Sequence, residues 1–363
     1  MSERNLTLQI DRSRHAQSRL HESELRPLAP GQVRFRVDRY AVTANTVTYA
    51  VVGDVLGYWD FFPTGEPGWG CVPAMGWADV VASTHPEVPT GGRYYGWFPM
   101  ARFVDMTVMP SADGLRDDGP HRAAHAPVYR AYVATGRDPL YQPGADAEDR
   151  HALLRGLFIT GWLAEDYLAD QDWFGAARVL VLSASSKTAI GFARCADART
   201  GIEVIGATSE RNHAFTHGLG CYDEVVGYGD IAAIPAGVPI VSVDMSGSGA
   251  VLGSVHAHFG DLLRHSMAIG RSHHESSPPA GNLPGPKPAF FFAPAQVKKR
   301  IADWGLGGYQ ARIGAALGQF VDWSRGWLRV QRTNGPAGAA AVWREAHAGR
   351  TPPGVGHVVS MWD

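Results

Sequence analysis

The feature that most constrains the fold is a regular alternation of apolar strands and short helices between residues 179 and 270. Strands that are buried on both faces form continuous apolar runs, and parallel neighbours are joined by helical crossovers. The pattern therefore predicts βαβ units and a doubly wound parallel sheet. The runs are VLVL (179–182), EVIGA (203–207), DEVVGY (223–228), PIVSVDM (239–245) and MAIG (267–270), with helices expected over 187–199, 209–218 and 250–265.

The preceding part of the chain has a different character. Residues 31–52 alternate polar and apolar side chains and continue into a β-branched run, which predicts a strand. The sequence up to residue 110 is rich in glycine, proline and aromatic residues. Short strands are expected at ADVVAS and GRYYGWF, as in a small barrel. Residues 111–150 are polar, and we interpret them as an insertion or linker within a first domain over 1–150.

The chain has 363 residues, a length that suits two domains. A helical apolar face that begins near Asp149 opens a second domain over 151–290. After a proline-rich stretch, a helix is expected from Pro294 to Gly305. The last strands, WLRVQR and HVVSM, have no βαβ partners, so we expect residues 291–363 to return to the first domain.

Composition limits the partners. With 45% hydrophobic residues, 19% charged residues and a net charge of −2, the chain offers no electrostatic reason to bind nucleic acid or an anionic membrane. A small-molecule substrate is the expected partner. The polar N-terminus and the lack of a long apolar stretch predict a cytoplasmic protein. Three scattered cysteines, Cys71, Cys195 and Cys221, are expected to be reduced thiols.

The order of the parts, a β-rich module, a nucleotide module and a return, resembles the medium-chain dehydrogenase/reductase superfamily, in particular its zinc-free quinone and enoyl reductases. The phrases that carry the resemblance are PGQVRFRVDRYAVTANTVTY, RVLVLSASSKTAIGFA, IEVIGATSERNHAFTHGLGCYDEVVGY and GRTPPGVGHVVSM. The resemblance implies an α/β fold in which a GroES-like β-rich barrel domain is combined with a Rossmann doubly wound parallel-sheet domain. It also implies a homodimer.

The phosphate-binding turn departs from the family. The family motif G-x-G-x-x-G, or A-S-G-G-V-G in reductases, reads Ala-Ser-Ser-Lys-Thr-Ala at residues 184–189. Ser183, Ser185 and Ser186 offer hydroxyl donors, and Lys187 offers a positive charge at a helix N-terminus, where an anion binds favourably. Thr188, the next residue, is also expected to bind the cofactor. The alternative is that the pocket has been lost and that the serines only cap the helix.

The end of the second strand indicates which cofactor is bound. An NAD site places Asp or Glu there for the ribose 2′-hydroxyl, whereas this chain has Thr208 and Ser209 followed by Arg211. This set favours the 2′-phosphate of NADPH. If the strand ends later, Glu210 would take the place of the acidic residue of an NAD site, so NAD remains an alternative cofactor.

No zinc site is expected. Three cysteines cannot form the superfamily's four-cysteine zinc loop, and residues 44–49 and 76–77 hold no ligand where catalytic zinc would be bound. Histidines are numerous after residue 255 but lack a ligand spacing, so we interpret them as solvated or hydrogen-bonded side chains. They are His256, His258, His265, His273 and His274.

Without a metal, the developing charge on a substrate needs hydroxyl or amide donors and a proton source. By resemblance, Asn45 and Thr46 lie beside the nicotinamide, and Tyr49 or Tyr58 donates the proton. The alternative is that Tyr49 is a packed strand residue and that Tyr58 belongs to an aromatic loop, GYWDFFP.

The leading hypothesis is an NADPH-dependent oxidoreductase that reduces an activated alkene, quinone or carbonyl compound. A non-catalytic protein that binds a nucleotide or metabolite is the second. An S-adenosylmethionine methyltransferase ranks third, because the glycine-rich first turn and the acidic second-strand end are missing.

Overall fold

The computed structural model describes residues 4–269 and 282–363, which form two compact units. The barrel unit contains the chain up to Leu153 together with Leu328–Asp363, and the sheet unit contains Leu154–Trp327. From the sequence we placed the return to the first domain at residue 291. It begins at 328 instead, because the helix at 293–324 belongs to the sheet unit.

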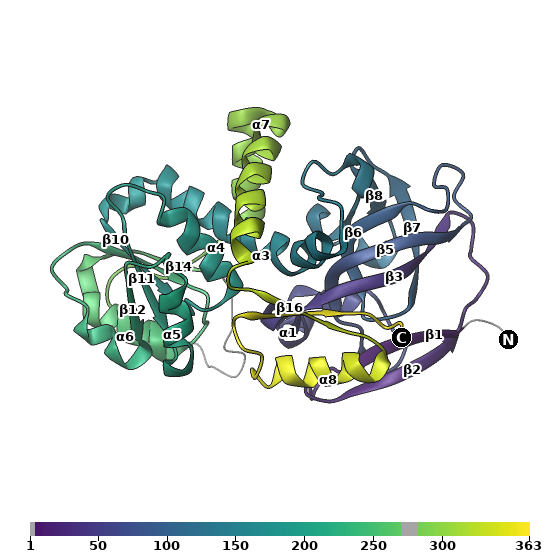
Figure 1. Cartoon of the computed structure of the whole chain (residues 1–363), viewed down its shortest axis with the longest axis horizontal. Helices are drawn as coiled ribbons and strands as arrows, with labels where there is room; N and C mark the ends of the chain where they lie inside the picture. The colour runs from purple at the N-terminus through teal and green to yellow at the C-terminus, as the bar shows by residue number, and fades with distance from the viewer. Residues whose placement is uncertain (1–3, 270–281) are drawn as a thin grey trace. The chain divides into compact units, whose positions relative to one another are not determined.

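Six antiparallel strands close the barrel unit on itself. Their order is β3-β5-β6-β9-β8-β7, and β7 pairs back with β3. Figure 1 labels five of these strands, β3, β5, β6, β7 and β8. This closure confirms the predicted GroES-like barrel. The strands are β3 (Gln32–Val42), β5 (Pro73–Ser83), β6 (Arg93–Pro99), β7 (Phe103–Pro110), β8 (Gly114–Asp117) and β9 (Ala131–Ala134).

The segment 111–150 is not simply an insertion, because it supplies β8 and β9. Each of these strands has only four residues, and Leu115 and Tyr132 are their buried apolar side chains. The Tyr132 ring stacks on Phe35 of β3 with ring centroids 5.9 Å apart, so β9 contributes to the barrel core. Strands this short leave no alternating pattern that could be recognised in the sequence.

The remaining elements of the barrel unit surround this barrel. β1, β2 and β4 form a separate three-stranded sheet, and β16 and β17 extend the barrel sheet beside β3. Their bounds are β1 (Arg4–Asp11), β2 (Ser18–Glu24), β4 (Trp69–Gly70), β16 (Arg329–Thr333) and β17 (Val355–Val359), with helices α1 (Ala44–Val51), α2 (Gly53–Leu56) and α8 (Pro336–His347).

The strand expected over residues 31–52 ends early. β3 stops at Val42, and the chain turns into helix α1 at Thr43. Thr43 and Thr46 form a capping box, in which each threonine side chain bonds to the backbone of the other. Local capping therefore overrides the β-branched composition of this segment.

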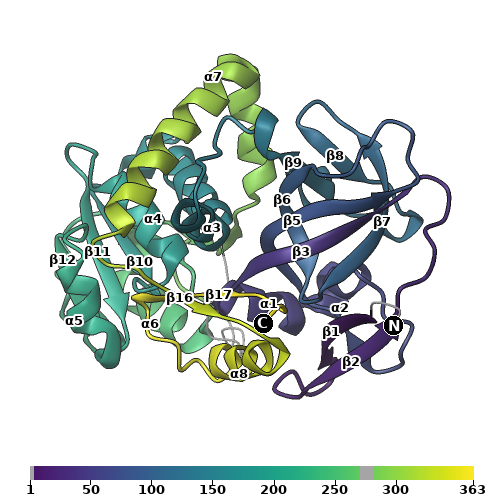
Figure 2. The same cartoon turned by 45° about the vertical axis from the view of Figure 1, so that its right-hand side comes forward.

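The sheet unit is a six-stranded parallel sheet in the order β12-β11-β10-β13-β14-β15, and Figure 2 shows its central strands with flanking helices. This order confirms the doubly wound Rossmann prediction. The strands are β10 (Arg178–Leu182), β11 (Glu203–Thr208), β12 (Glu224–Gly227), β13 (Ile240–Asp244), β14 (Leu263–Ala268) and β15 (Ala289–Phe290). The helices are α4 (Lys187–Ala196), α5 (Glu210–Gly218), α6 (Gly249–Phe259) and α7 (Ala293–Ser324), while α3 (Ala145–Asp170) crosses the boundary at Leu153.

Two helix ends differ from expectation. α6 stops at Phe259 rather than residue 265, because Gly260 takes a positive φ of 48°. Gly305, expected to end a helix, has φ 72° and ψ 160°, yet the helix resumes and α7 continues to Ser324. Gly270, His273 and His274 lie outside the described residues. No helix in the described ranges is long and apolar enough to cross a membrane.

An ion-pair network centred on Glu148 and Asp149, at the start of α3, joins four segments of the barrel unit. Arg93 on β6 bonds to Glu148 at 2.6 Å, and Arg39 on β3 bonds to Glu148 at 3.1 Å and to Asp149 at 3.0 Å. Arg332 on β16 also pairs with Asp149. Asp149 is completely buried, so its charge depends on these partners.

We predict that Asp149→Ala lowers the free energy of unfolding of the barrel unit by about 1.5–3 kcal/mol, since it removes charge-assisted hydrogen bonds to Arg39 and Arg332, while Arg39 keeps Asp38 and Glu148 as partners. Urea unfolding measures this. The matched control is Asp54→Ala, which removes an exposed pair with Arg12 and is expected to cost less than about 1 kcal/mol. Equal losses in the two variants would contradict the structural role of the network.

Candidate functional site

The parallel sheet brings the candidate cofactor residues to one edge. β10 pairs with β11 on one side and β13 on the other, and Leu182 lies opposite both Ala207 and Asp244. The chain reverses its direction of winding between β10 and β13. Ligands of doubly wound sheets bind at such a point, outside the carboxyl ends of the strands.

The turn after β10 is rigid although it lacks glycine. Ser183 has a φ of 60°, a left-handed conformation that is uncommon for a residue other than glycine. The Tyr228 phenol hydrogen-bonds to Ser183, and the Tyr222 hydroxyl donates to the carbonyl oxygen of Ala184 at 2.8 Å. These bonds fix a backbone path that glycine would adopt without strain.

Helix α4 begins directly after this turn, so its N-terminus lies at the same edge of the sheet. Ser186 is its N-cap and accepts a hydrogen bond from the Ala189 amide at 3.4 Å, so this serine acts as the cap that the alternative interpretation assigned to it. Lys187 and Thr188 follow in the first turn and are half-buried. Burial lowers the pKa of Lys187 to about 8.

Ser185 is the centre of a small polar cluster with Thr208 and Asn212. Its hydroxyl oxygen accepts a hydrogen bond from Thr208 Oγ1 at 3.2 Å and another from Asn212 Nδ2 at 3.0 Å. Ser185 and Thr208 are buried, whereas Asn212 is partly exposed. Asn212 was missed from the sequence, although its place one turn after the second strand could have suggested it.

The other candidates after β11 are more exposed. Ser209 is the N-cap residue of α5 without a side-chain capping bond, and Glu210 and Arg211 in the first turn are both exposed. β11 ends at Thr208, so Glu210 lies two residues beyond the strand. The structure therefore groups Ser185, Thr208 and the start of α5 at one place.

The β13 end offers a second helix N-terminus at the same edge. The Asp244 carboxylate accepts hydrogen bonds from the Ser246 amide and hydroxyl at 2.7 and 2.6 Å, and Ser248 caps α6. Met245 Sδ lies 3.9 Å from Ser186 Oγ. The turns after β10 and β13 are thus in contact.

In the barrel unit, helix α1 brings Asn45 and Tyr49 together. Asn45 Nδ2 donates to the Tyr49 hydroxyl at 2.8 Å, and Trp97 Nε1 donates to the same oxygen at 3.4 Å. Burial raises the pKa of Tyr49, while the bonds from Trp97 and Asn45 act to lower it. Tyr49 is therefore a buried helix residue and not the strand residue of the alternative interpretation.

Thr46 is already engaged in the fold. Its hydroxyl accepts from the Thr43 amide at 3.1 Å and donates to the Ala41 carbonyl, and the side chain is buried. These bonds hold the start of α1 and leave the hydroxyl no proton for a substrate. A position of Thr46 beside the nicotinamide stays a prediction.

Tyr58 belongs to a second aromatic group. Its hydroxyl lies 3.2 Å from that of Tyr129, and its ring centroid lies 4.7 Å from that of Tyr49. Arg122, fully buried, donates to the carbonyl oxygens of Phe61 and Tyr129 and so ties the two tyrosine-bearing segments together. Burial raises the pKa of Tyr58. Tyr129 and Arg122 come from the polar stretch that we interpreted as an insertion, where no sequence signal marked them.

Two of the predicted histidines in the sheet unit have hydrogen-bond partners. His256 is buried between the Pro284 carbonyl at 2.8 Å and the Ser266 hydroxyl at 2.9 Å, and His258 bonds to the Ile234 carbonyl at 2.7 Å. Within residues 4–269 and 282–363, no three His, Cys, Asp or Glu side chains are grouped as a metal site requires. The absence of zinc stays a prediction.

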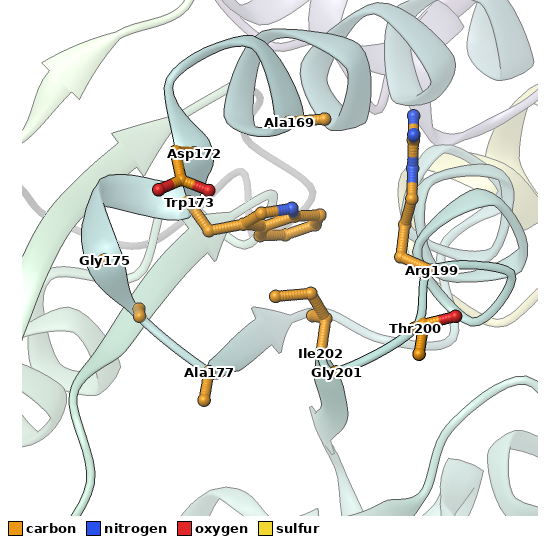
Figure 3. Close-up of a pocket in the computed structure, with 10 residues that line it drawn as sticks. Ala169, Asp172, Trp173, Gly175, Ala177, Arg199, Thr200, Gly201 and Ile202 are labelled. Atoms are coloured by element: carbon orange, nitrogen blue, oxygen red, sulfur yellow. The ribbon is translucent and has the colours of Figure 1, made fainter.

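A cavity of about 450 Å³ lies elsewhere in the sheet unit (Figure 3). Its wall includes Ala177 and Ile202, which directly precede β10 and β11, so it opens at the amino ends of these strands. Trp173 projects into it, and Arg199, which pairs with the buried Glu165, lines another wall. The predicted cofactor residues lie at the opposite edge of the sheet, and none of them lines this cavity.

Proteins of known structure with the same fold include an enoyl reductase and two proteins solved in complex with NADPH. CurA from Vibrio vulnificus in complex with NADPH is 15% identical, with a TM-score of 0.59 and 98% of each chain covered. The enoyl reductase CurK is 15% identical, with a TM-score of 0.54, 98% of this chain and 99% of that chain covered. The mycobacterial Rv1454c complexed with NADPH is 12% identical, with a TM-score of 0.54, 98% of this chain and 99% of that chain covered. At these identities the similarity confirms the fold that the sequence resemblance implied.

Sequence comparison adds the family. A search of curated proteins found no match to the chain. The family model DUF2855, described as a protein of unknown function, matches residues 40–352. Because this match covers most of the 363 residues, the chain belongs to the DUF2855 family.

Proposed function

We propose that this protein is an NADPH-dependent, zinc-independent oxidoreductase that reduces an activated alkene, quinone or carbonyl compound. The observation that carries the proposal is the polar edge of the sheet at the point where its winding reverses. There the N-terminus of α4, Lys187 and the Ser185 cluster occupy the place where doubly wound sheets bind dinucleotides. The fold similarity to proteins solved with NADPH supports the same cofactor.

The residues at this edge suit the two charged parts of NADPH. The α4 amides, Lys187 and Thr188 would hold the pyrophosphate, because a helix N-terminus and a lysine both favour an anion. Arg211, in the first turn of α5, would pair with the 2′-phosphate. When bound, NADPH supplies the hydride.

The barrel unit supplies a hydroxyl suited to proton transfer. A phenol oxygen has two lone pairs, and in Tyr49 the amide of Asn45 and the indole of Trp97 donate to it. The Tyr49 proton is therefore left to donate to an enolate or alkoxide, and the same two N–H groups stabilise the phenolate that remains. The hydroxyl of Tyr58 is hydrogen-bonded to that of Tyr129, so we assign the role of proton donor to Tyr49.

One observation favours the second candidate, a non-catalytic nucleotide- or metabolite-binding protein. Ser186 is occupied as a helix cap, and Thr46 is occupied in the α1 capping box. Two of the expected site hydroxyls thus serve the fold. Turnover separates the two candidates, because only the oxidoreductase consumes NADPH.

We predict that the purified protein oxidises NADPH with at least one compound in a panel of enones, quinones and aldehydes, with or without a chelator. With a compound that the protein reduces, Tyr49→Phe should lower kcat by about 100-fold or more, since it removes the proton donor. Tyr58→Phe is the matched control and should keep most of the activity. NADPH binding without turnover on the whole panel would favour the second candidate.

Arg211→Ala should raise the Kd of NADPH by about tenfold or more and leave that of NADH nearly unchanged, because only NADPH has the 2′-phosphate. Fluorescence titration with both cofactors measures this. Equal losses for both cofactors would show that Arg211 acts through folding or another contact.

Lys187→Ala should weaken the binding of both NADPH and NADH, since both contain the pyrophosphate. The Tm of the free protein should change little. Because the pKa of Lys187 is lowered to about 8, its charge is present below that pH, and affinity for both cofactors should fall as the pH rises through 8. Lys187→Gly restores the family's residue but removes the charge. If Lys187→Gly binds NADPH as well as the parent, the charge of Lys187 does not hold the phosphate.

A further inference from the structure

A strained turn forms one wall of the cavity at the amino ends of β10 and β11. Asp172, Trp173 and Phe174 have φ angles of 48°, 50° and 54°, so three successive non-glycine residues adopt the left-handed conformation. This conformation is disfavoured for each of them, and it persists only where the surroundings enforce it. The ring of Phe174 stacks on that of His265, with the centroids 4.2 Å apart and the planes at 8°. The turn thereby keeps the Trp173 ring in the cavity wall (Figure 3).

The cavity carries opposite charges on two sides. Figure 3 shows the exposed Asp172 and the guanidinium of Arg199 on opposite sides of the Trp173 ring. Arg199 donates from Nε and Nη2 to the buried carboxylate of Glu165 at 2.7 and 3.1 Å, which fixes the guanidinium. In the described part of the chain, no acceptor engages its Nη1. A guanidinium that is held in place and still has N–H groups to donate is suited to bind a carboxylate.

Apolar side chains complete the wall between the two charges. Besides Trp173, the lining includes Ala169, Ala177 and Ile202. An indole ring attracts both apolar groups and cations, so it suits a ligand that carries an apolar body next to a positive charge. The volume of about 450 Å³ lies within the range of sites for small molecules. The cavity therefore matches a small ligand with two opposite charges and an apolar part.

We propose that this cavity binds a free amino acid with an apolar or aromatic side chain. The ammonium group of the ligand lies at Asp172, its carboxylate at Arg199 and its side chain against Trp173. A ligand with only a negative charge would be repelled by Asp172, and one with only a positive charge would leave Arg199 without an acceptor. The site lies at the edge of the sheet opposite the predicted cofactor residues, so it is independent of the proposed reductase function.

Calorimetry on the full chain tests which charges the ligand needs. The probes are L-leucine, L-phenylalanine and L-tryptophan, and at least one should bind with a Kd of about 1 mM or lower. Two analogues of phenylalanine each lack one charge: 3-phenylpropionate has no ammonium group, and phenethylamine has no carboxylate. If phenylalanine binds, each analogue should bind about tenfold more weakly or worse, since each leaves one charged group of the cavity without its partner.

Two variants of Asp172 separate binding from folding. Asp172→Asn removes the charge but keeps a side chain that tolerates the left-handed conformation, so the Kd of the amino acid should rise about tenfold or more with little change in Tm. Asp172→Gly relieves the backbone strain as well, so it should raise the Tm of the free protein while it weakens the amino acid. A residue with only a structural role would not move these two quantities in opposite senses. Asp261→Asn, which removes an exposed carboxylate outside the cavity, is the matched control and should leave the affinity unchanged.

Arg199→Lys tests the other charge. It keeps a cation beside Glu165 but removes the guanidinium fork, so it should weaken the amino acid and 3-phenylpropionate and leave phenethylamine nearly unchanged.

Wild-type protein that binds none of the three amino acids would overturn the proposal. So would 3-phenylpropionate or phenethylamine that binds as tightly as phenylalanine, because the site would then recognise a single charge. Equal losses in Asp172→Asn and Asp261→Asn would show that net charge and not the cavity controls binding. The affinity for NADPH should be the same in all of these variants, so the outcome for this site and the outcome for the proposed cofactor site are measured separately.

Discussion

The parallel pairing of β10 with β11 and β13 is the constraint on which the candidate cofactor site depends. The shared register of Leu182 with Ala207 and Asp244 brings three turns that are distant in sequence to one edge of the sheet. This pairing places Ser185, Thr208 and Asp244 at that edge. Since residues 179–182 of β10 are apolar and fully buried between two other strands, the hydrophobic core of the sheet fixes the geometry of the polar residues that follow them.

In each unit, one hydroxyl oxygen accepts hydrogen bonds from two donors. In the sheet unit, two donors occupy the oxygen of Ser185, and in the barrel unit two N–H groups occupy the oxygen of Tyr49. Each hydroxyl keeps its proton for a partner outside the cluster. In the proposed reaction, the Tyr49 proton is the one that goes to the oxygen on which charge develops in the reduced substrate.

The sequence predicted the sheet well, because strands buried on both faces leave apolar runs that local rules can recognise. It predicted α1 wrongly, since the Thr43 and Thr46 capping box outweighs a β-branched composition. β8 and β9 were missed because four-residue strands show no periodicity, and with them Tyr129 and Arg122. Asn212 was missed because its contact with Ser185 joins two turns that are distant in sequence, and only its place one turn after the second strand pointed to it.

A crystal structure of the protein with NADPH tests the central claim most directly. The account predicts that the cofactor lies across the carboxyl ends of β10 and β13, with its pyrophosphate at the N-terminus of α4 and its 2′-phosphate within hydrogen-bond distance of Arg211. A cofactor bound in the cavity at the amino ends of β10 and β11, or one whose 2′-phosphate makes no contact with Arg211, would contradict it.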